Sequence, residues 1–235
     1  MISRNRPVVA IDGPAGAGKS TVTRLVAARL GYWLLDTGAL YRAVALAVVR
    51  AGIDWADTER ISTFASELVR REGLIVERGH DGEQLVRLDG EEVQGLLRSQ
   101  EIGAGASRIS SLPRVREALL ALQRRAAERG GVVVEGRDIG TVVFPDAEAK
   151  FFLTASVEVR ARRRFDELAA RGAAPSLEDV RREVVERDLR DTERAVAPLR
   201  RAQDAELVDS SELDLEAVVG RIVERVHSVE RRLKG

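Results

Sequence analysis

Residues 13–20 read Gly13-Pro14-Ala15-Gly16-Ala17-Gly18-Lys19-Ser20, and this glycine-rich segment is the strongest indication of the fold. It matches the pattern G-x-x-x-x-G-K-[ST], in which a glycine-rich turn presents backbone N–H groups to phosphates. Residues 7–12 before it form an apolar run that predicts a buried strand, and residues 22–30 after it carry apolar residues at helical spacing. Because this loop requires a strand before it and a helix after it, the sequence predicts a site for the phosphates of a nucleoside triphosphate.

Each part of the loop has a chemical task. Lys19 is expected to reach the β and γ phosphates, and the Ser20 hydroxyl is placed to hold Mg²⁺. A chance glycine-rich turn is the alternative, but every fixed position of the pattern is filled and the flanking segments are correct. The residues expected to contact the triphosphate are Gly13, Pro14, Ala15, Gly16, Ala17, Gly18, Lys19, Ser20 and Thr21.

Composition narrows the class of protein. The chain has 235 residues, of which 44% are hydrophobic and 32% charged, and its 38 Lys plus Arg balance 38 Asp plus Glu. This balance gives no overall positive field for nucleic acid or an anionic membrane. The chain carries no apolar run of about 18 residues and no signal-peptide stretch, so a cytoplasmic location is expected. With no cysteine, thiolate catalysis and Cys-based zinc sites are excluded, and His80 and His227 are expected at the surface.

Strand and helix patterns alternate along the chain. The expected parallel strands are residues 7–12, 32–36, 132–135, 150–153 and 206–209. The expected helices are residues 21–30, 38–52, 57–71, 100–110, 113–129, 157–170, 176–195 and 214–233. Short alternating runs at 74–77, 85–88 and 91–93, separated by turns at 79–82 and 89–90, predict a small antiparallel insertion. The alternation predicts an α/β, doubly wound sheet.

Two arginines follow strands of this predicted sheet. Arg42 comes after the second strand and Arg137 after the third, and ligands of such sheets lie beyond the carboxyl ends of the strands. A guanidinium binds a phosphate through two parallel hydrogen bonds, so the pair is suited to a second anionic substrate. Structural pairing with a carboxylate is the alternative for either arginine alone.

A third basic cluster lies in the predicted helix 157–170. Arg160, Arg163 and Arg164 are spaced to share one face, just before the turn at 171–175. A hinged basic lid over a transferring phosphoryl group would use such a face, whereas a solvated helix is the ordinary alternative.

Several stretches together resemble the bacterial cytidylate kinase family, nucleoside monophosphate kinases of the P-loop fold. The matching stretches span nearly the whole chain and are residues 11–21, 35–42, 113–120, 135–145 and 186–194. The resemblance implies a P-loop kinase fold in a single domain, 1–235, with a five-stranded parallel sheet and helices on both faces. It also implies a small antiparallel insertion in the monophosphate-binding region at about 38–98, and a helical lid at about 158–175.

The resemblance further implies phosphoryl transfer from ATP with Mg²⁺ to CMP or dCMP, in a protein expected to be a monomer. The implied catalytic residues are Lys19, Arg160, Arg163 and Arg164. The implied substrate residues are Arg42 and Arg137 for the phosphate, Thr37, Arg116, Asp138 and Arg194 for cytosine, Ser107, Arg187 and Asp191 for the sugar, and Tyr41. Family members often have serine where this chain has Thr37. Uracil would reverse one hydrogen-bond donor of cytosine, which is a strong basis for its rejection.

Three other functions are compatible with the phosphate loop but fit the rest of the sequence less well. A regulatory GTPase needs an Asn-Lys-x-Asp motif, and the only asparagine of the chain is Asn5. A P-loop kinase for another small metabolite, such as shikimate, leaves the antiparallel insertion and the arginines at 187–194 without a reason. A non-catalytic nucleotide-binding module leaves the phosphate-directed arginines unexplained.

Overall fold

The computed structural model describes residues 4–79, 83–170 and 172–234. It contains two compact units, Met1–Tyr32 with Gly130–Gly235, and Trp33–Arg129. His80, most of the predicted turn at 79–82 and residue 171 of the predicted lid lie outside the described residues. Among the residues described, no helix is both long and apolar enough to cross a membrane.

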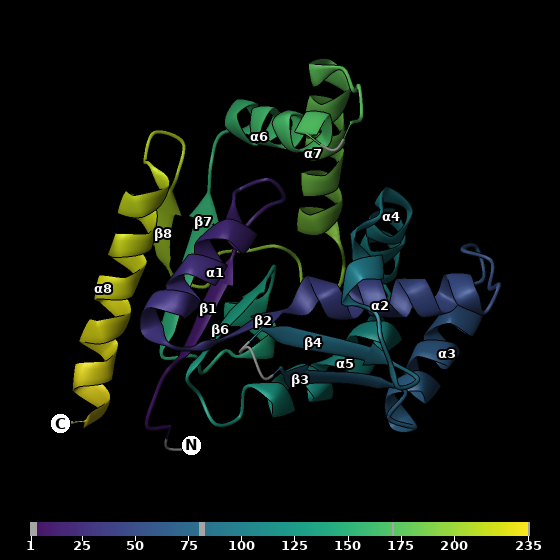
Figure 1. The fold of residues 1–235 in the computed structure, drawn as a ribbon, viewed down its shortest axis with the longest axis horizontal. Helices are drawn as coiled ribbons and strands as arrows, with labels where there is room; N and C mark the ends of the chain where they lie inside the picture. The colour runs from purple at the N-terminus through teal and green to yellow at the C-terminus, as the bar shows by residue number, and fades with distance from the viewer. Residues whose placement is uncertain (1–3, 80–82, 171, 235) are drawn as a thin grey trace. The chain divides into compact units, whose positions relative to one another are not determined.

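The first unit is built on parallel strands (Figure 1). Its strands are β1 (Val8–Asp12), β6 (Val132–Gly136), β7 (Ala149–Thr154) and β8 (Glu206–Asp209). β1 lies between β6 and β7, and every residue of β1 and β6 is buried, which explains their unbroken apolar runs. Asp12 pairs with both Gly136 and Phe152, so the carboxyl ends of three strands meet at one edge.

Two helices of the first unit pack on these strands, and two others pack against each other. The helices of the first unit are α1 (Lys19–Leu30), α6 (Val157–Ala170), α7 (Leu177–Glu193) and α8 (Leu215–Lys234), with a π turn η2 (Ile139–Val143). α1 packs on α8, and both contact the sheet, whereas α6 packs on α7 (Figure 1).

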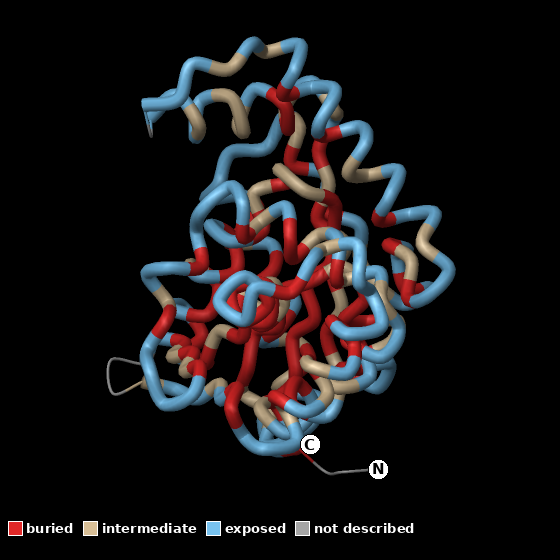
Figure 2. The backbone as a smooth tube through the Cα atoms, turned by 90° about the vertical axis from the view of Figure 1, so that its right-hand side faces the viewer, coloured by how far each residue is buried: buried red, intermediate tan, exposed pale blue. Residues whose placement is uncertain are grey.

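The second unit holds the predicted antiparallel insertion. Its elements are β2 (Trp33–Asp36), α2 (Thr37–Arg50), α3 (Thr58–Arg70), β3 (Leu74–Arg78), β4 (Gln84–Leu88), β5 (Glu91–Glu92), the 3₁₀ helix η1 (Gln94–Arg98), α4 (Gln100–Ile109) and α5 (Pro113–Ala126). β4 pairs with β3 and β5 in antiparallel order. Buried residues recur at helical spacing in α3, for example Ile61, Ala65 and Leu68. Figure 2 shows buried and exposed stretches alternating along the chain.

The predicted fold class is confirmed. The large sheet has five strands in the order β2-β6-β1-β7-β8, and the small sheet has three. The patterns missed two short elements, η1 and η2, because a single irregular turn has no period to detect. The helix predicted at 113–129 ends earlier, at Ala126, ahead of Gly130 and Gly131, which adopt φ of 68° and 64°.

Candidate active site

The phosphate loop joins β1 to α1, as predicted. Gly16 and Gly18 have φ of 74° and 84°, and Gly18 is the cap residue of α1. A Cβ at Gly13 would lie 1.9 Å from the carbonyl oxygen of Leu153 in β7, so only glycine fits between these backbones. The loop therefore leads directly into the amino end of a helix, where unpaired N–H groups attract anions.

Lys19 lies at this helix start and is 5% exposed. Its Nζ donates a hydrogen bond to the carbonyl oxygen of Pro14 at 2.7 Å. Burial, reinforced by the charge of Arg137 and opposed by that of Glu135, lowers the pKa of Lys19 to about 7. Anionic phosphates beside this amine would favour its charged form.

Glu135, at the end of β6, organises two hydroxyl groups of α1. Its Oε1 accepts from the Ser20 hydroxyl at 2.9 Å, and its Oε2 accepts from the Thr23 hydroxyl at 3.1 Å. Sequence reasoning missed Glu135 as a site residue and Thr23 as its second hydrogen-bond partner. The signal was present, because Glu135 is the one carboxylate in a strand otherwise made of valine and glycine.

Asp12 was also missed, although it ends the apolar strand before the loop. Its carboxylate oxygens accept from the backbone N–H groups of Ile139 and Gly140, each at 2.8 Å. Burial raises the pKa of Asp12 to about 6, and the two backbone hydrogen bonds oppose that rise. Asp12 thus fixes the start of η2, immediately after Arg137 and Asp138.

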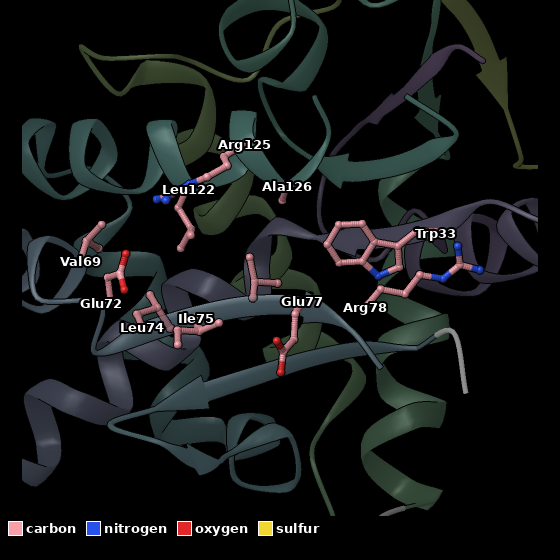
Figure 3. Close-up of a pocket in the computed structure, with 11 residues that line it drawn as sticks. Trp33, Val69, Glu72, Leu74, Ile75, Glu77, Arg78, Leu122, Arg125 and Ala126 are labelled. Atoms are coloured by element: carbon pink, nitrogen blue, oxygen red, sulfur yellow. The ribbon is translucent and has the colours of Figure 1, made fainter. Parts of the chain in front are cut away.

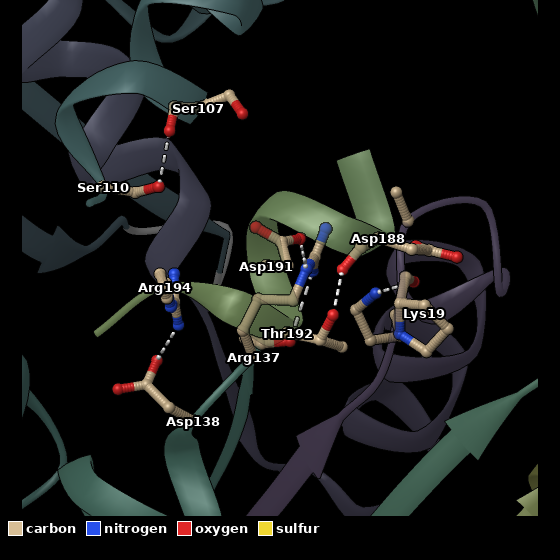
Figure 4. Close-up of polar contacts among 12 residues, drawn as sticks. Lys19, Ser107, Ser110, Arg137, Asp138, Asp188, Asp191, Thr192 and Arg194 are labelled. Atoms are coloured by element: carbon tan, nitrogen blue, oxygen red, sulfur yellow. Dashed lines mark hydrogen bonds and ion pairs between the residues drawn. The ribbon is translucent and has the colours of Figure 1, made fainter. Parts of the chain in front are cut away.

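Arg137 pairs with Asp191 of α7 (Figure 4). Arg137 Nε lies 2.9 Å from Asp191 Oδ2. Burial alone would raise the pKa of Asp191, but the charges of Arg137, Arg187 and Arg194 hold it below its usual range. The structure therefore groups these three predicted substrate arginines around one carboxylate, and the structural pairing weighed for Arg137 is present.

Asp138 and Arg194 form a second buried pair, with 3.5 Å between Arg194 Nη2 and Asp138 Oδ1 (Figure 4). Arg194 Nε also donates to the carbonyl oxygen of Ala197 at 2.6 Å. Two residues predicted to contact cytosine are therefore held side by side in the first unit.

The three arginines of the predicted lid have different surroundings. Arg160 is buried, and its Nη1 lies 3.0 Å from the carbonyl oxygen of Ala15 and 2.6 Å from Asp188 Oδ2. Arg163 Nη2 donates to the carbonyl oxygen of Ser210 at 2.8 Å.

Arg164 pairs with Glu167 of the same helix at 2.9 Å. Arg160 therefore reaches the backbone of the phosphate loop, whereas Arg164 lies in an i,i+3 pair of the kind common on exposed helix faces. Asp188 and Ser210 were not predicted.

In the second unit, Asp36 ends β2 and caps α2. Its Oδ1 accepts from the N–H of Ala39 at 3.3 Å, and its Oδ2 lies 2.5 Å from Arg42 Nη2. Thr37, next to Asp36, is buried. The structural pairing weighed for Arg42 is therefore present too.

Ser107, Arg116 and Tyr41 also lie together in the second unit. The carbonyl oxygen of Ser107 accepts from the Ser110 hydroxyl at 2.9 Å (Figure 4). Arg116 Nη1 donates to the carbonyl oxygen of Ser110 at 3.1 Å, and the guanidinium lies over the Tyr41 ring, 5.7 Å from its centroid. Three predicted substrate residues, on α2, α4 and α5, are thus connected.

A cavity of about 410 Å³ lies elsewhere in the second unit, between β3, α3 and α5 (Figure 3). Its walls include Trp33, Leu74 and Leu122, together with the charged side chains of Glu72 and Arg125. None of the predicted site residues lines it. The cavity is therefore distinct from the candidate site.

Comparison with known proteins identifies the family of the chain. The family model described as cytidylate kinase matches residues 9–228. The cytidylate kinase of Pseudomonas aeruginosa (strain LESB58) is 50% identical over 217 residues, covering 92% of this chain and 93% of that protein. The cytidylate kinase of Pelotomaculum thermopropionicum is 50% identical over 225 residues, covering 96% of this chain and 98% of that protein.

A third relative and one solved structure extend the comparison. The cytidylate kinase of Citrifermentans bemidjiense is 51% identical over 219 residues, covering 93% of this chain and 91% of that protein. A solved shikimate kinase from Acinetobacter baumannii covers 95% of this chain and 94% of its own, with 16% identity and a TM-score of 0.43, and this likeness carries no weight for the substrate. On the family model and the relatives at half identity, the chain belongs to the cytidylate kinase family.

Proposed function

We propose that this enzyme transfers the γ-phosphoryl group of ATP to CMP and dCMP, forming ADP with CDP or dCDP. The observation that carries the proposal is the buried Asp138–Arg194 pair beside Arg137, in the same unit as the phosphate loop. The pair offers a carboxylate and a guanidinium, the two groups that cytosine requires. The alternative, a kinase for another small metabolite, gives this pair no task.

The phosphate loop would bind ATP. Its backbone N–H groups would surround the phosphates, and Lys19 would place its charge between the β and γ positions. Phosphoryl transfer depends on positioning and charge stabilisation more than on covalent chemistry by the protein. Arg160, already bonded to the carbonyl oxygen of Ala15, would keep the lid helices next to the loop, and Arg163 would meet the transferring group.

Mg²⁺ would enter with ATP. The Ser20 hydroxyl would supply a hard oxygen ligand, and the Glu135 carboxylate, which accepts a hydrogen bond from it at 2.9 Å, would orient that hydroxyl toward the ion. Mg²⁺ usually keeps several waters and binds the phosphates of the nucleotide, so it needs few ligands from the protein. When bound, the ion would neutralise charge on the β and γ phosphates.

Cytosine would be recognised by complementary hydrogen bonding. The exocyclic amine would donate to Asp138 and to the Thr37 hydroxyl, while O2 and N3 would accept from Arg116 and Arg194. Uracil presents a carbonyl oxygen where cytosine has its amine, and that oxygen would face a desolvated carboxylate. Arg42 and Arg137 would hold the CMP phosphate, with Tyr41 at the Arg116 guanidinium.

The sugar hydroxyls would contact Ser107, Arg187 and Asp191. The carboxylate form of Asp191 is favoured because three arginine charges lower its pKa. It would accept a hydrogen bond from a ribose hydroxyl. We further expect the enzyme to act as a monomer.

Product analysis tests the proposal. The purified protein with ATP, Mg²⁺ and CMP should form CDP and ADP in equal amounts, as resolved by anion-exchange chromatography. Lys19→Met is the matched control, because it removes the charge but nearly preserves side-chain length. Consumption of ATP without CDP would contradict the proposed acceptor.

A further inference from the structure

Gln84 uses both ends of its side-chain amide on one neighbouring residue. It is the first residue of β4, in the antiparallel sheet, and is 7% exposed. Its Oε1 accepts from the backbone N–H of Asp36 at 2.6 Å, and its Nε2 donates to the backbone carbonyl of Asp36 at 3.2 Å. The side chain therefore satisfies both backbone groups of the last residue of β2, as a paired strand would.

Asp36 in turn controls the start of α2. Its carboxylate caps the helix at Ala39 and lies 2.5 Å from Arg42 Nη2. The space around these groups is tight, because a Cβ at Gly38 would lie 3.0 Å from Asp36 Oδ1 and 3.2 Å from Arg42 Nη1. A shift of the Asp36 backbone would therefore move the carboxylate that orients Arg42.

We propose that Gln84 is a positioning residue for the monophosphate, acting through Asp36 on Arg42. The inference rests on the proposed function, in which Arg42 holds the CMP phosphate. It assigns the antiparallel sheet a specific task, since β4 supplies the side chain that fixes the end of β2. Gln84 itself touches neither the nucleotide nor the reacting atoms.

Gln84→Leu tests this role, because leucine has a similar size but offers no hydrogen bond. The KM for CMP, and the Kd for CMP measured calorimetrically without ATP, should each rise about tenfold, equivalent to about 1.4 kcal/mol. The KM for ATP should stay within about twofold, since the phosphate loop belongs to the other unit. Equal increases in both KM values, or no change in the KM for CMP, would overturn the proposal.

Val86→Ala is the matched control. Val86 lies on the same strand and is fully buried, but it contacts the apolar core of the unit. Its truncation should lower Tm while leaving the KM for CMP unchanged. If this variant raised the KM for CMP as much as Gln84→Leu does, general loosening of the sheet would explain the effect and the positioning role would be wrong.

A double variant tests the route through Arg42. In an Arg42→Ala background, Gln84→Leu should cause no further loss of CMP affinity, because the group it orients is absent. Additive losses would refute the route. If Gln84→Leu fails to fold, Gln84→Glu keeps the size and one acceptor, and should raise the KM for CMP in the same direction. A wild type that does not phosphorylate CMP would instead refute the proposed function.

Discussion

Glu135→Gln is the sharpest test of how the phosphate loop is organised. Glu135 accepts from Ser20 at 2.9 Å and from Thr23 at 3.1 Å, one hydroxyl on each carboxylate oxygen. Because the Ser20 hydroxyl donates its hydrogen bond to the carboxylate, its oxygen lone pairs are directed outward, toward the expected Mg²⁺. The amide keeps one acceptor oxygen but replaces the other with an NH₂ group, so one hydroxyl must reorient.

The size of the effect follows from these contacts. A hydrogen bond to a charged group contributes about 1.5–3 kcal/mol and a neutral one about 1 kcal/mol, so the substitution should cost about 1–2 kcal/mol of folding stability. For a protein of this size that corresponds to a fall in Tm of roughly 3–6 °C. Loss of a group that orients a metal ligand typically lowers activity or metal affinity by about 10–100-fold.

The assay is the initial rate of ADP release at saturating ATP and CMP, measured as a function of Mg²⁺ concentration. Glu135→Gln should need more Mg²⁺ for half-maximal rate and should have a lower kcat. Thr23→Val is the matched control, because it removes one donor to Glu135 but keeps the Ser20 contact. The Tm of Thr23→Val should fall by a similar amount, while its kcat should stay within about twofold of wild type. A Mg²⁺ dependence unchanged in Glu135→Gln would refute the reasoning.

Four further substitutions test other parts of the site. Lys19→Met should abolish turnover, by a factor on the order of 10² or more, yet raise stability near pH 6. The folded state lowers the pKa of Lys19 from 10.5 to about 7, so below pH 7 the charged lysine destabilises the fold, and this cost falls as pH rises from 7 toward 10.5. Urea denaturation should therefore show that the stability gained by Lys19→Met shrinks as pH rises over that range. Asp138→Asn should lower the ratio of kcat/KM for CMP to kcat/KM for UMP, because the amide can donate a hydrogen bond to O4 of uracil. An unchanged ratio would show that Asp138 does not recognise the base. Arg160→Ala should lower Tm by several degrees, because the buried Arg160 contacts both Asp188 and the carbonyl oxygen of Ala15. Arg164→Ala should lower Tm only slightly, because the Arg164–Glu167 ion pair is partly exposed. Equal decreases in Tm would contradict this difference.

Periodicity and the loop pattern were enough to predict most of the fold. The buried strands β1 and β6 are continuous apolar runs, and the phosphate loop lies between β1 and α1 as its pattern requires. The π turn η2 could not be predicted, because Asp12, distant in sequence, shapes it by binding two of its N–H groups. Such a contact leaves no local signal.

In the candidate site, too, contacts between residues distant in sequence could not be predicted. Arg42 and Arg137 could be proposed from their places after strands, but their partners Asp36 and Asp191 are properties of the fold. Similarly, the charge run at 160–164 could not reveal that Arg160 is buried against the loop while Arg164 pairs with Glu167. A helical face indicates which side chains are neighbours, but the tertiary partners decide what each one does.

The most direct test of the account is the kcat/KM of the purified enzyme for a panel of phosphoryl acceptors, measured by ADP release with ATP and Mg²⁺. The panel should contain CMP, dCMP, UMP, AMP, GMP and shikimate. CMP and dCMP should be the preferred acceptors, UMP should be much poorer, and shikimate should not be phosphorylated. Preference for UMP, AMP, GMP or shikimate over CMP would contradict the assignment of Asp138 and Arg194 to cytosine, and with it the proposed function.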